Sequence, residues 1–207
     1  ATLDRPDQAI DAYRKALVLD PHFPNAHNNL GLLLGRRGAA DEAIACFRAS
    51  IEIRPDDVVA HNNLGNALLA SDEPEAAVAS YRRALTMRPD YVDAHYNLGA
   101  ALRDWGKPEE AVEVLRAALR LQPDFAQAHN SLAAALQETG ALDEATASVR
   151  TALRLEPNYA EAHFNLHALL LEKERVAPAI ECLRHAVRIA PEDTGFRFFL
   201  GMLLDCS

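Results

Sequence analysis

Asparagine has the most suggestive spacing of the polar residues in this chain. A primary amide carries two donors and an acceptor, so a row of amides matches the C=O and N–H groups of an extended peptide backbone. Asparagine is also a poor helix former, so its repeated use within helical segments needs a reason. The alternative is that the same amides hydrogen-bond to a neighbouring helix and only hold the stack together. The candidate peptide-binding residues are these amides and two aromatic residues among them: Asn28, Asn29, Asn62, Asn63, Asn66, Tyr96, Asn97, Asn130, Phe164 and Asn165.

Histidine recurs once every 34 residues and raises the question of a metal site. The five positions are His27, His61, His95, His129 and His163. Packed helices lie about 8–10 Å apart, whereas zinc holds its ligands at about 2.0–2.1 Å, so successive histidines cannot share an ion. His163 and His167 have helical spacing, but Phe164 stands where a zinc-protease helix carries glutamate. We therefore predict no metal and no cofactor, and assign the histidines to helix packing.

The remaining reactive residues form no catalytic motif. The chain has neither a glycine-rich phosphate loop nor a nucleophile elbow. Acidic residues gather where second helices are expected to begin, at the positive end of the helix dipole. The three cysteines are an odd number, and Cys46 and Cys182 lie 136 residues apart (182 − 46), so we interpret them as small buried side chains. We predict no enzymatic activity.

Composition excludes two classes of partner. The 207 residues include 21 Lys and Arg against 30 Asp and Glu, which gives a net charge of -9. This charge disfavours binding to nucleic acid or to anionic lipid. No apolar run approaches the roughly 20 residues that cross a bilayer, and no signal segment opens the chain. We expect a soluble, cytoplasmic protein with no nucleic-acid or membrane partner.

The elements that carry these side chains are copies of one 34-residue unit. Proline recurs at Pro21, Pro55, Pro89, Pro123, Pro157 and Pro191, and leucine at Leu30, Leu64, Leu98, Leu132, Leu166 and Leu200. Such a period indicates an array of one supersecondary unit, here two amphipathic helices with short turns. We expect a single array over 1–207, with the second helix of a partial repeat at 1–23, full repeats at 24–57, 58–91, 92–125, 126–159 and 160–193, and the first helix of a further repeat at 194–207. We interpret the chain as a fragment of a longer array.

Glycine and capping residues predict where the helices end. With Pro24 as position 1 of the unit, Gly38, Gly106 and Gly140 share position 15, where a left-handed turn suits glycine. Glu174 takes that position in the fifth unit, so we expect an altered turn there. Glycine at position 8 (Gly31, Gly65, Gly99) predicts close passage of the partner helix. Capping boxes are expected at Asp90 with Asp93, Asp124 with Gln127, and Asn158 with Glu161.

The last segment is unusually apolar. Terminal repeats need a polar outer face to remain soluble, yet this one carries Phe198, Phe199 and Met202. These three side chains are the candidate interface for self-association.

The repeated residues resemble the tetratricopeptide repeat signature. The first unit supplies Leu30, Gly31, Leu34, Ala43, Phe47 and Pro55, and the second Leu64, Gly65, Leu68, Ala77, Tyr81, Ala84 and Pro89. Histidine replaces the aromatic residue of that family at position 4. The resemblance covers essentially the whole chain and implies an all-α fold, a right-handed α-solenoid of tandem 34-residue helix-turn-helix repeats. It also implies that first helices line a concave groove.

The stretches AHNNLG at 26–31 and 60–65 are similar to the repeats of nucleocytoplasmic O-linked N-acetylglucosamine transferases. In that family, asparagines at the positions of Asn29, Asn63, Asn97 and Asn165 form a ladder that holds substrate backbone. Here Ser131 interrupts the ladder, which ends at Phe199, and the catalytic region has no counterpart. The chain also does not resemble the tetratricopeptide domains that hold a C-terminal carboxylate with lysine and arginine in the groove. Asparagine and aspartate occupy those groove positions here.

The favoured function is therefore a protein-interaction module that binds a protein or an extended peptide in the concave groove through the asparagine ladder. Two alternatives stay open. One is the substrate-recognition arm of a glycosyltransferase whose catalytic domain lies outside these residues. The other is a self-assembling scaffold, a homo-oligomer formed through the apolar C-terminal end.

Overall fold

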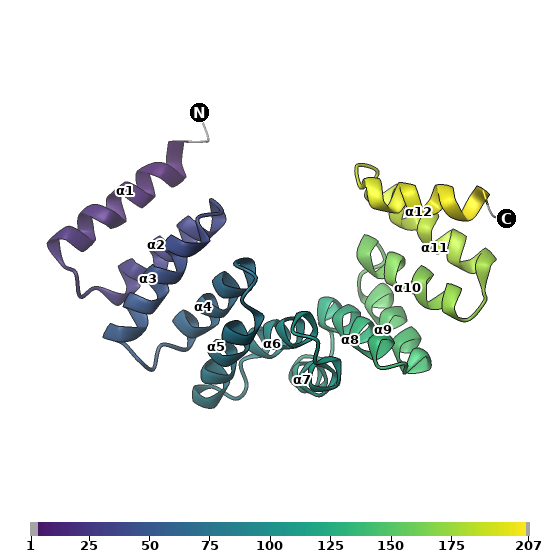
Figure 1. Cartoon of the computed structure of the whole chain (residues 1–207), viewed down its shortest axis with the longest axis horizontal. Helices are drawn as coiled ribbons and strands as arrows, with labels where there is room; N and C mark the ends of the chain where they lie inside the picture. The colour runs from purple at the N-terminus through teal and green to yellow at the C-terminus, as the bar shows by residue number, and fades with distance from the viewer. Residues whose placement is uncertain (1–3, 206–207) are drawn as a thin grey trace. The chain divides into compact units, whose positions relative to one another are not determined.

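The structure is a computed structural model that describes residues 4–205, and these residues contain twelve helices and no strand (Figure 1). The helices are α1 (Asp4–Leu19), α2 (Pro24–Arg36), α3 (Ala40–Ile53), α4 (Val58–Ala70), α5 (Pro74–Met87), α6 (Val92–Asp104), α7 (Pro108–Leu121), α8 (Ala126–Glu138), α9 (Leu142–Leu155), α10 (Ala160–Glu172), α11 (Val176–Ile189) and α12 (Thr194–Asp205). First helices start at every thirty-fourth residue from Pro24 and second helices at every thirty-fourth residue from Ala40. The all-α fold of two-helix repeats expected from the sequence is confirmed.

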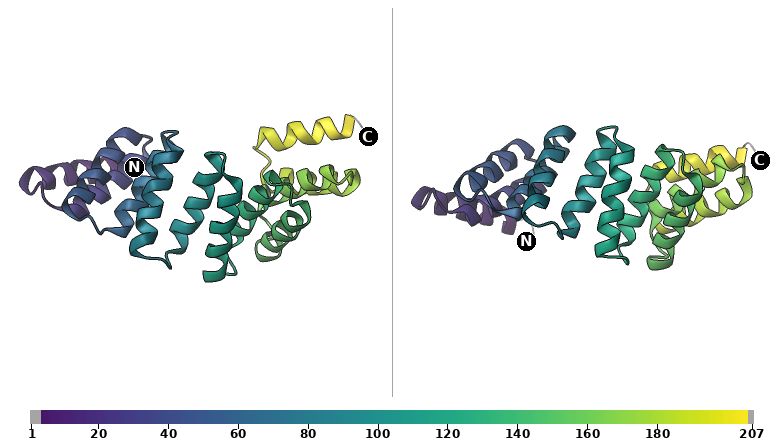
Figure 2. Two further views of the ribbon diagram at one scale, coloured as in Figure 1. Left: turned by 60° about the horizontal axis from the view of Figure 1, so that its bottom comes forward. Right: turned by 90° about the horizontal axis from the view of Figure 1, so that it is seen from below.

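Contacts divide the chain into two compact units, residues 1–105 and 106–207. In the first unit, α2 packs closely on α3 and α4 on α5, while α1 lies against α2. In the second, α8 pairs with α9 and α10 with α11, and α12 lies against α11, as the yellow helix in Figure 2 shows. Each unit is therefore built from helical hairpins whose neighbours in sequence are neighbours in space.

Small side chains set the distance between the two helices of a hairpin. Alanine at position 20 is fully buried, as at Ala43, Ala77, Ala145 and Ala179. The predicted close passage at position 8 is confirmed at Gly31 and Gly65, where an aromatic ring of the partner helix lies against the glycine. A Cβ placed on Gly31 would lie 2.8 Å from the ring of Phe47, and one on Gly65 would lie 2.6 Å from that of Tyr81. Glycine is required there because its hydrogen leaves room for the ring.

The turn inside each hairpin is left-handed, as predicted. Gly38, Gly106 and Gly140 have φ of 78°, 73° and 80°. The altered turn expected in the fifth repeat is wrong, because Glu174 adopts the same conformation with φ of 55°. The turn is closed in the same way as well, since Arg175 N donates to Leu170 O at 2.8 Å.

Replacing Glu174 by glycine is expected to raise the free energy of unfolding by about 0.5–1 kcal/mol. A left-handed conformation costs a residue with a β-carbon about 1–2 kcal/mol, and the greater freedom of glycine in the unfolded chain returns about 0.5–1 kcal/mol of this. Urea denaturation followed by circular dichroism measures the change. As a control, Glu181→Gly in the middle of α11 should lower stability by about 1 kcal/mol. Equal losses in both variants would contradict the strain at Glu174.

The capping boxes expected before three first helices are wrong. The N-cap residues of α6, α8 and α10 are Tyr91, Phe125 and Tyr159, and none of their side chains makes a capping hydrogen bond. The helices begin one residue later than the polar pairs suggested. Side-chain caps are instead found at Asp57, whose carboxylate accepts from Val59 N and Ala60 N at 3.1 and 3.0 Å, and at Asp193, which accepts from Phe196 N at 3.0 Å.

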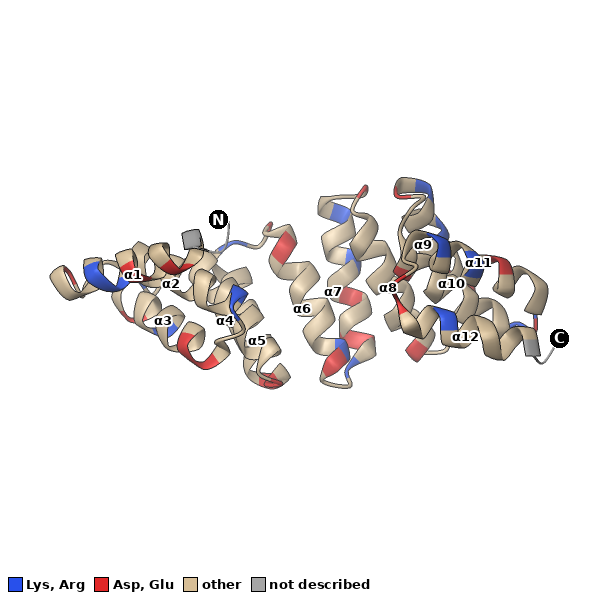
Figure 3. Cartoon of the chain, turned by 90° about the horizontal axis from the view of Figure 1, so that it is seen from above, with Lys and Arg blue, Asp and Glu red and all other residues tan. Residues whose placement is uncertain are grey.

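Charged residues are interspersed along the helices, as the red and blue segments in Figure 3 show. Ion pairs join successive second helices at Arg14–Glu42 (2.9 Å) and Arg116–Glu144 (2.6 Å). These are exposed contacts of small energetic weight. Within residues 4–205, no helix combines the length and the apolar character needed to cross a bilayer.

Candidate functional site

The repeated histidines hold the turns between repeats. In each case Nε2 lies 2.8–3.1 Å from the carbonyl oxygen of the proline six residues earlier, in the pairs His27–Pro21, His61–Pro55, His95–Pro89, His129–Pro123 and His163–Pro157. A carbonyl can only accept, so Nε2 must carry the hydrogen. This contact explains a histidine where an aromatic residue was expected, and its signal in the sequence is the constant spacing to proline. The described residues contain no group of three or more potential metal ligands.

The last of these histidines lies in a basic cluster of the second unit. Burial lowers the pKa of His163, and the nearby His185 and Arg188 lower it further. Its ring stacks on that of His185, with centroids 5.1 Å apart. The Nδ1 atom of His163 is buried without a hydrogen-bond partner. The neutral ring is therefore the form that the fold accommodates.

Most of the predicted peptide-binding asparagines bond to one another. Nδ2 at position 6 donates to Oδ1 at position 5 of the preceding repeat, 35 residues earlier. The pairs are Asn63 to Asn28 (3.1 Å), Asn97 to Asn62 (3.1 Å) and Asn165 to Asn130 (2.9 Å). The first helices of neighbouring repeats are thereby joined within each unit. Such helix-to-helix hydrogen bonds are expected from the alternative explanation, in which the amides hold the stack together.

Burial separates the asparagines into two groups. Asn62, Asn63 and Asn130 are only 5–8% exposed, so their amides are mainly enclosed between helices. Asn28, Asn97 and Asn165 are half-buried. Asn29 and Asn66 are exposed, and each meets a tyrosine hydroxyl: Asn29 donates to Tyr13 at 3.2 Å, and Asn66 accepts from Tyr81 at 2.6 Å. The exposed pair has the amide groups most accessible to a ligand.

The aromatic candidates have different surroundings. Tyr96 is half-buried on α6. Phe164 packs against rings of α12, with centroids 5.1 Å from Phe196 and 5.4 Å from Phe199. On α12, Phe198, Phe199 and Met202 remain 64%, 42% and 50% exposed. Phe164 therefore belongs to the packing of α10 on α12.

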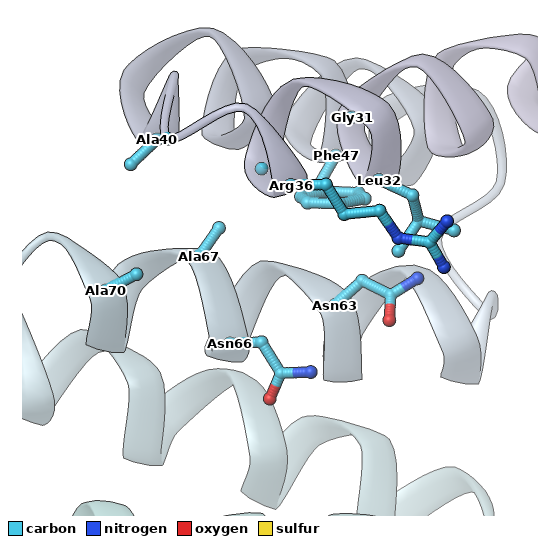
Figure 4. Close-up of a pocket in the computed structure, with 11 residues that line it drawn as sticks. Gly31, Leu32, Arg36, Ala40, Phe47, Asn63, Asn66, Ala67 and Ala70 are labelled. Atoms are coloured by element: carbon cyan, nitrogen blue, oxygen red, sulfur yellow. The ribbon is translucent and has the colours of Figure 1, made fainter. Parts of the chain in front are cut away.

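A pocket of about 350 Å³ opens in the first unit between the α2–α3 hairpin and α4 (Figure 4). Its wall is mainly apolar and includes Leu32, Phe47, Ala67 and Ala70. Asn63, Asn66 and Arg36 supply the polar groups at its edge, and Figure 4 shows the Arg36 side chain beside Leu32. A small number of polar groups around an apolar hollow is the usual composition of a ligand pocket, whose volume is typically about 300–1,000 Å³.

Gly35 lines the pocket and has no side chain that could fill it. The same position of the unit is Leu69 in the second repeat and Leu171 in the fifth, with longer polar residues in the third and fourth. The nearest atom to a Cβ on Gly35 would be 3.9 Å away, at Ala43. Two of the predicted peptide-binding residues, Asn63 and Asn66, line this pocket. Its apolar part was not predicted, although a glycine at a position otherwise taken by large residues is a visible signal.

Electrostatics add one feature to this pocket. Arg36 and the adjacent Arg37 are both exposed, but only Arg37 has an ion pair among the described residues, to Asp7 at 2.9 Å. Arg36 thus presents a guanidinium at the rim, where it can meet a carboxylate. Tyr81 fixes the opposite side, because its hydroxyl engages the Asn66 oxygen and leaves the amide N–H groups for another acceptor.

The cysteines offer no comparable chemistry. Cys46 and Cys182 are free and half-buried, on α3 and α11. Burial raises the pKa of both thiols, so the reactive thiolate is disfavoured.

Comparison with known proteins supports the repeat fold along nearly the whole chain. Models of the tetratricopeptide repeat match residues 62–124, 101–155 and 139–194, a second model matches 23–90, and a third matches 5–38. No curated protein matches significantly.

Several solved structures have a similar fold. MamA is 29% identical, with a TM-score of 0.71 over 75% of this chain and 91% of that one. TTC0263 of Thermus thermophilus, a thermophilic TPR protein, is 25% identical, with a TM-score of 0.72 over 88% and 99%. YrrB, described as a TPR protein with an unusual peptide-binding site, is 23% identical, with a TM-score of 0.71 over 93% and 99%.

Proposed function

Because this chain belongs to the tetratricopeptide repeat family, we propose that it is a protein-interaction module that binds an extended peptide segment and performs no catalysis within these residues. The fold is compatible with this role, since YrrB, which shares it, has a peptide-binding site. The observation that carries the proposal is the pocket between α2, α3 and α4.

The pocket accommodates one apolar side chain of the peptide. Its apolar wall gains contact area when a ligand displaces water, and full burial of a Leu- or Phe-sized group stabilises by about 1.5–3 kcal/mol. Phe47 forms part of this wall and is itself only 3% exposed. An anchor residue in a preformed hollow is how a small surface achieves binding.

The polar groups at the rim orient the peptide. Arg36 pairs with a carboxylate next to the anchor residue, from an acidic side chain or from the chain terminus. Asn66 donates its amide N–H to a backbone carbonyl, because Tyr81 already occupies its oxygen. Asn63 lines the same pocket and is held by Asn28. The asparagine ladder thus contributes at this pocket as a pre-oriented group of amides.

The glycosyltransferase alternative has less support. It depends on the asparagine positions, and in this chain the amides of Asn63, Asn97 and Asn165 donate to neighbouring asparagines. We therefore prefer a general peptide-binding role.

Filling the pocket is expected to weaken peptide binding by about tenfold to a hundredfold, which corresponds to the loss of one buried apolar side chain. Peptides of about 12 residues are selected from a random display library on the 207-residue chain. Their affinities are then measured by fluorescence anisotropy on Gly35→Leu. This variant should fold, because leucine is the native residue at the same position in Leu69 and Leu171.

The adjacent residues Arg36 and Arg37 provide a test variant and a matched control. Arg36→Ala should weaken the binding of acidic peptides about two- to fivefold and reduce the salt dependence of their binding. Arg37→Ala removes the same charge outside the pocket and should leave the affinity unchanged. Failure to select any peptide, or equal binding by the wild type and the folded Gly35→Leu variant, would refute the pocket as the binding site.

A further inference from the structure

An arginine recurs at position 25 of each described second helix, as Arg14, Arg48, Arg82, Arg116, Arg150 and Arg184. Glutamate at position 19 of the next second helix pairs with this arginine in Arg14–Glu42 (2.9 Å) and Arg116–Glu144 (2.6 Å). Between α3 and α5, Ala76 takes the place of the glutamate. Arg48 has no ion pair within residues 4–205, so its guanidinium is available to a ligand.

Arg48 borders a second hollow of the first unit, which lies between α3, α4 and α5 and which we call the α3–α5 hollow. Its volume is about 370 Å³, and most of its surface is apolar, with Ile51 from α3 and Leu64 from α4. Arg83 of α5 lines it as well. The α3–α5 hollow shares no lining residue with the α2–α4 pocket.

The hydrogen-bond donors that remain free in this hollow are cationic. His61 uses Nε2 on the carbonyl oxygen of Pro55 at 3.1 Å. Ser80 donates its hydroxyl to the carbonyl oxygen of Ala76 at 3.0 Å. Arg48 and Arg83 are exposed, and Arg83 also has no ion pair within residues 4–205. A ligand of this hollow therefore meets two guanidinium groups, which favour a carboxylate and can bind it with two parallel hydrogen bonds.

The local charge is opposite in sign to that of the whole chain. The α3–α5 hollow carries two arginines against one acidic residue, Glu52, in a chain whose net charge is -9. Exposed charges more than about 8 Å away are largely screened at physiological salt, so the nearby arginines dominate. At the equivalent place between α1 and α3, Ala49 replaces the second arginine, and Arg14 already pairs with Glu42. The free positive charge is thus specific to the α3–α5 hollow within these two places.

We propose that the α3–α5 hollow binds an acidic segment of a partner protein, with one apolar side chain on Ile51 and Leu64 and flanking carboxylates on Arg48 and Arg83. The apolar surface favours a peptide over a small inorganic anion, because only a peptide can cover it. The inference goes beyond the proposed function, since it adds a second contact surface built from other residues.

Ala76→Glu is the direct test, because it supplies the missing glutamate and removes nothing from the hollow. The new carboxylate should pair with Arg48 as Glu42 pairs with Arg14. The variant should fold, since position 19 is natively glutamate elsewhere and an acidic residue suits the first turn of α5. Binding of an acidic peptide should weaken about two- to fivefold, whereas Ala76→Gln, of equal size and without charge, should leave it unchanged.

The probe is acetyl-Glu-Asp-Leu-Asp-Glu-amide, titrated to about 10 mM into the 207-residue chain and followed by the NMR signals of the arginine side chains. Every chain in this series carries Gly35→Leu, which fills the α2–α4 pocket, so failure of that pocket as a peptide site does not affect the result. The uncharged peptide acetyl-Gln-Asn-Leu-Asn-Gln-amide should bind at least fivefold more weakly. Replacing the leucine of the probe by alanine should weaken binding about three- to tenfold.

Charge variants of the hollow give effects of opposite sign. Arg48→Gln combined with Arg83→Gln should weaken binding of the acidic probe about fourfold to twenty-fivefold, whereas Glu52→Gln should strengthen it about twofold. Absence of binding up to 10 mM, or equal affinity in the double variant, would overturn the proposal. Inorganic phosphate that binds as tightly as the probe at equal ionic strength would also overturn it, because the site would then hold a simple anion.

Discussion

Replacing Gly65 by valine is expected to lower the free energy of unfolding by about 3 kcal/mol. Its Cβ would lie 2.6 Å from the ring of Tyr81, which is fully buried and whose hydroxyl is held by Asn66. The ring cannot move aside without losing this hydrogen bond, and overpacking of a rigid core typically costs about 1–3 kcal/mol or more. Urea denaturation followed by circular dichroism provides the measurement.

Gly31→Val is the matched control for this variant. Phe47 approaches the new Cβ almost as closely, at 2.8 Å, but its ring has no polar anchor and borders the pocket. The ring can shift into that space, so we expect a loss of about 1 kcal/mol. Equal losses in the two variants would show that the hydrogen bond and the burial of Tyr81 do not restrain the ring.

Replacing Asn130 by alanine should destabilise the second unit by about 2 kcal/mol. Asn130 is 7% exposed, accepts from Asn165 at 2.9 Å and approaches the Tyr159 hydroxyl at 3.4 Å. Its removal leaves the Asn165 donor without this acceptor in a half-buried place, and such unsatisfied groups cost about 1–3 kcal/mol each. Thermal and urea denaturation of the variant measure the loss.

Asn29→Ala is the control, because Asn29 is exposed and its bond to Tyr13 competes with water. We expect a change below about 0.5 kcal/mol. Peptides that bind the α2–α4 pocket should bind Asn130→Ala with unchanged affinity, since Asn130 lies in the other unit. Unchanged stability of Asn130→Ala, together with lost peptide affinity, would instead support a purely ligand-binding role for this amide.

The 34-residue period made the helices predictable, because the repeated prolines and leucines keep their spacing even where the residues between them differ. Gly38, Gly106 and Gly140 correctly located the turns. Glu174 was misjudged, since the closed hairpin imposes the left-handed conformation even where no glycine eases it. Local capping patterns failed for a similar reason, because the register of the whole repeat fixes the helix start, and the N-cap of α6 is Tyr91 rather than Asp90.

The candidate site was less predictable than the fold. The sequence identified the amides, but the contact of Asn63 with Asn28 depends on how far one first helix is displaced along the next. The acceptor of His27 is a backbone carbonyl, which no side-chain pattern reveals. The apolar part of the pocket contains no reactive group, so its signal in the sequence is Gly35, a lining residue without a side chain at a position that is larger in the other repeats.

The 35-residue link between neighbouring first helices makes the order of the repeats part of the information in the chain. The same two positions are joined as amide to amide at Asn130 and Asn165, but as ring to ring at Phe164 and Phe199. The residue at position 5 of one repeat therefore determines which kind of residue at position 6 of the next repeat can pack against it. Shuffling the units would set an amide against a phenyl ring, so these modules are not interchangeable, and any engineered rearrangement must exchange matched neighbours together.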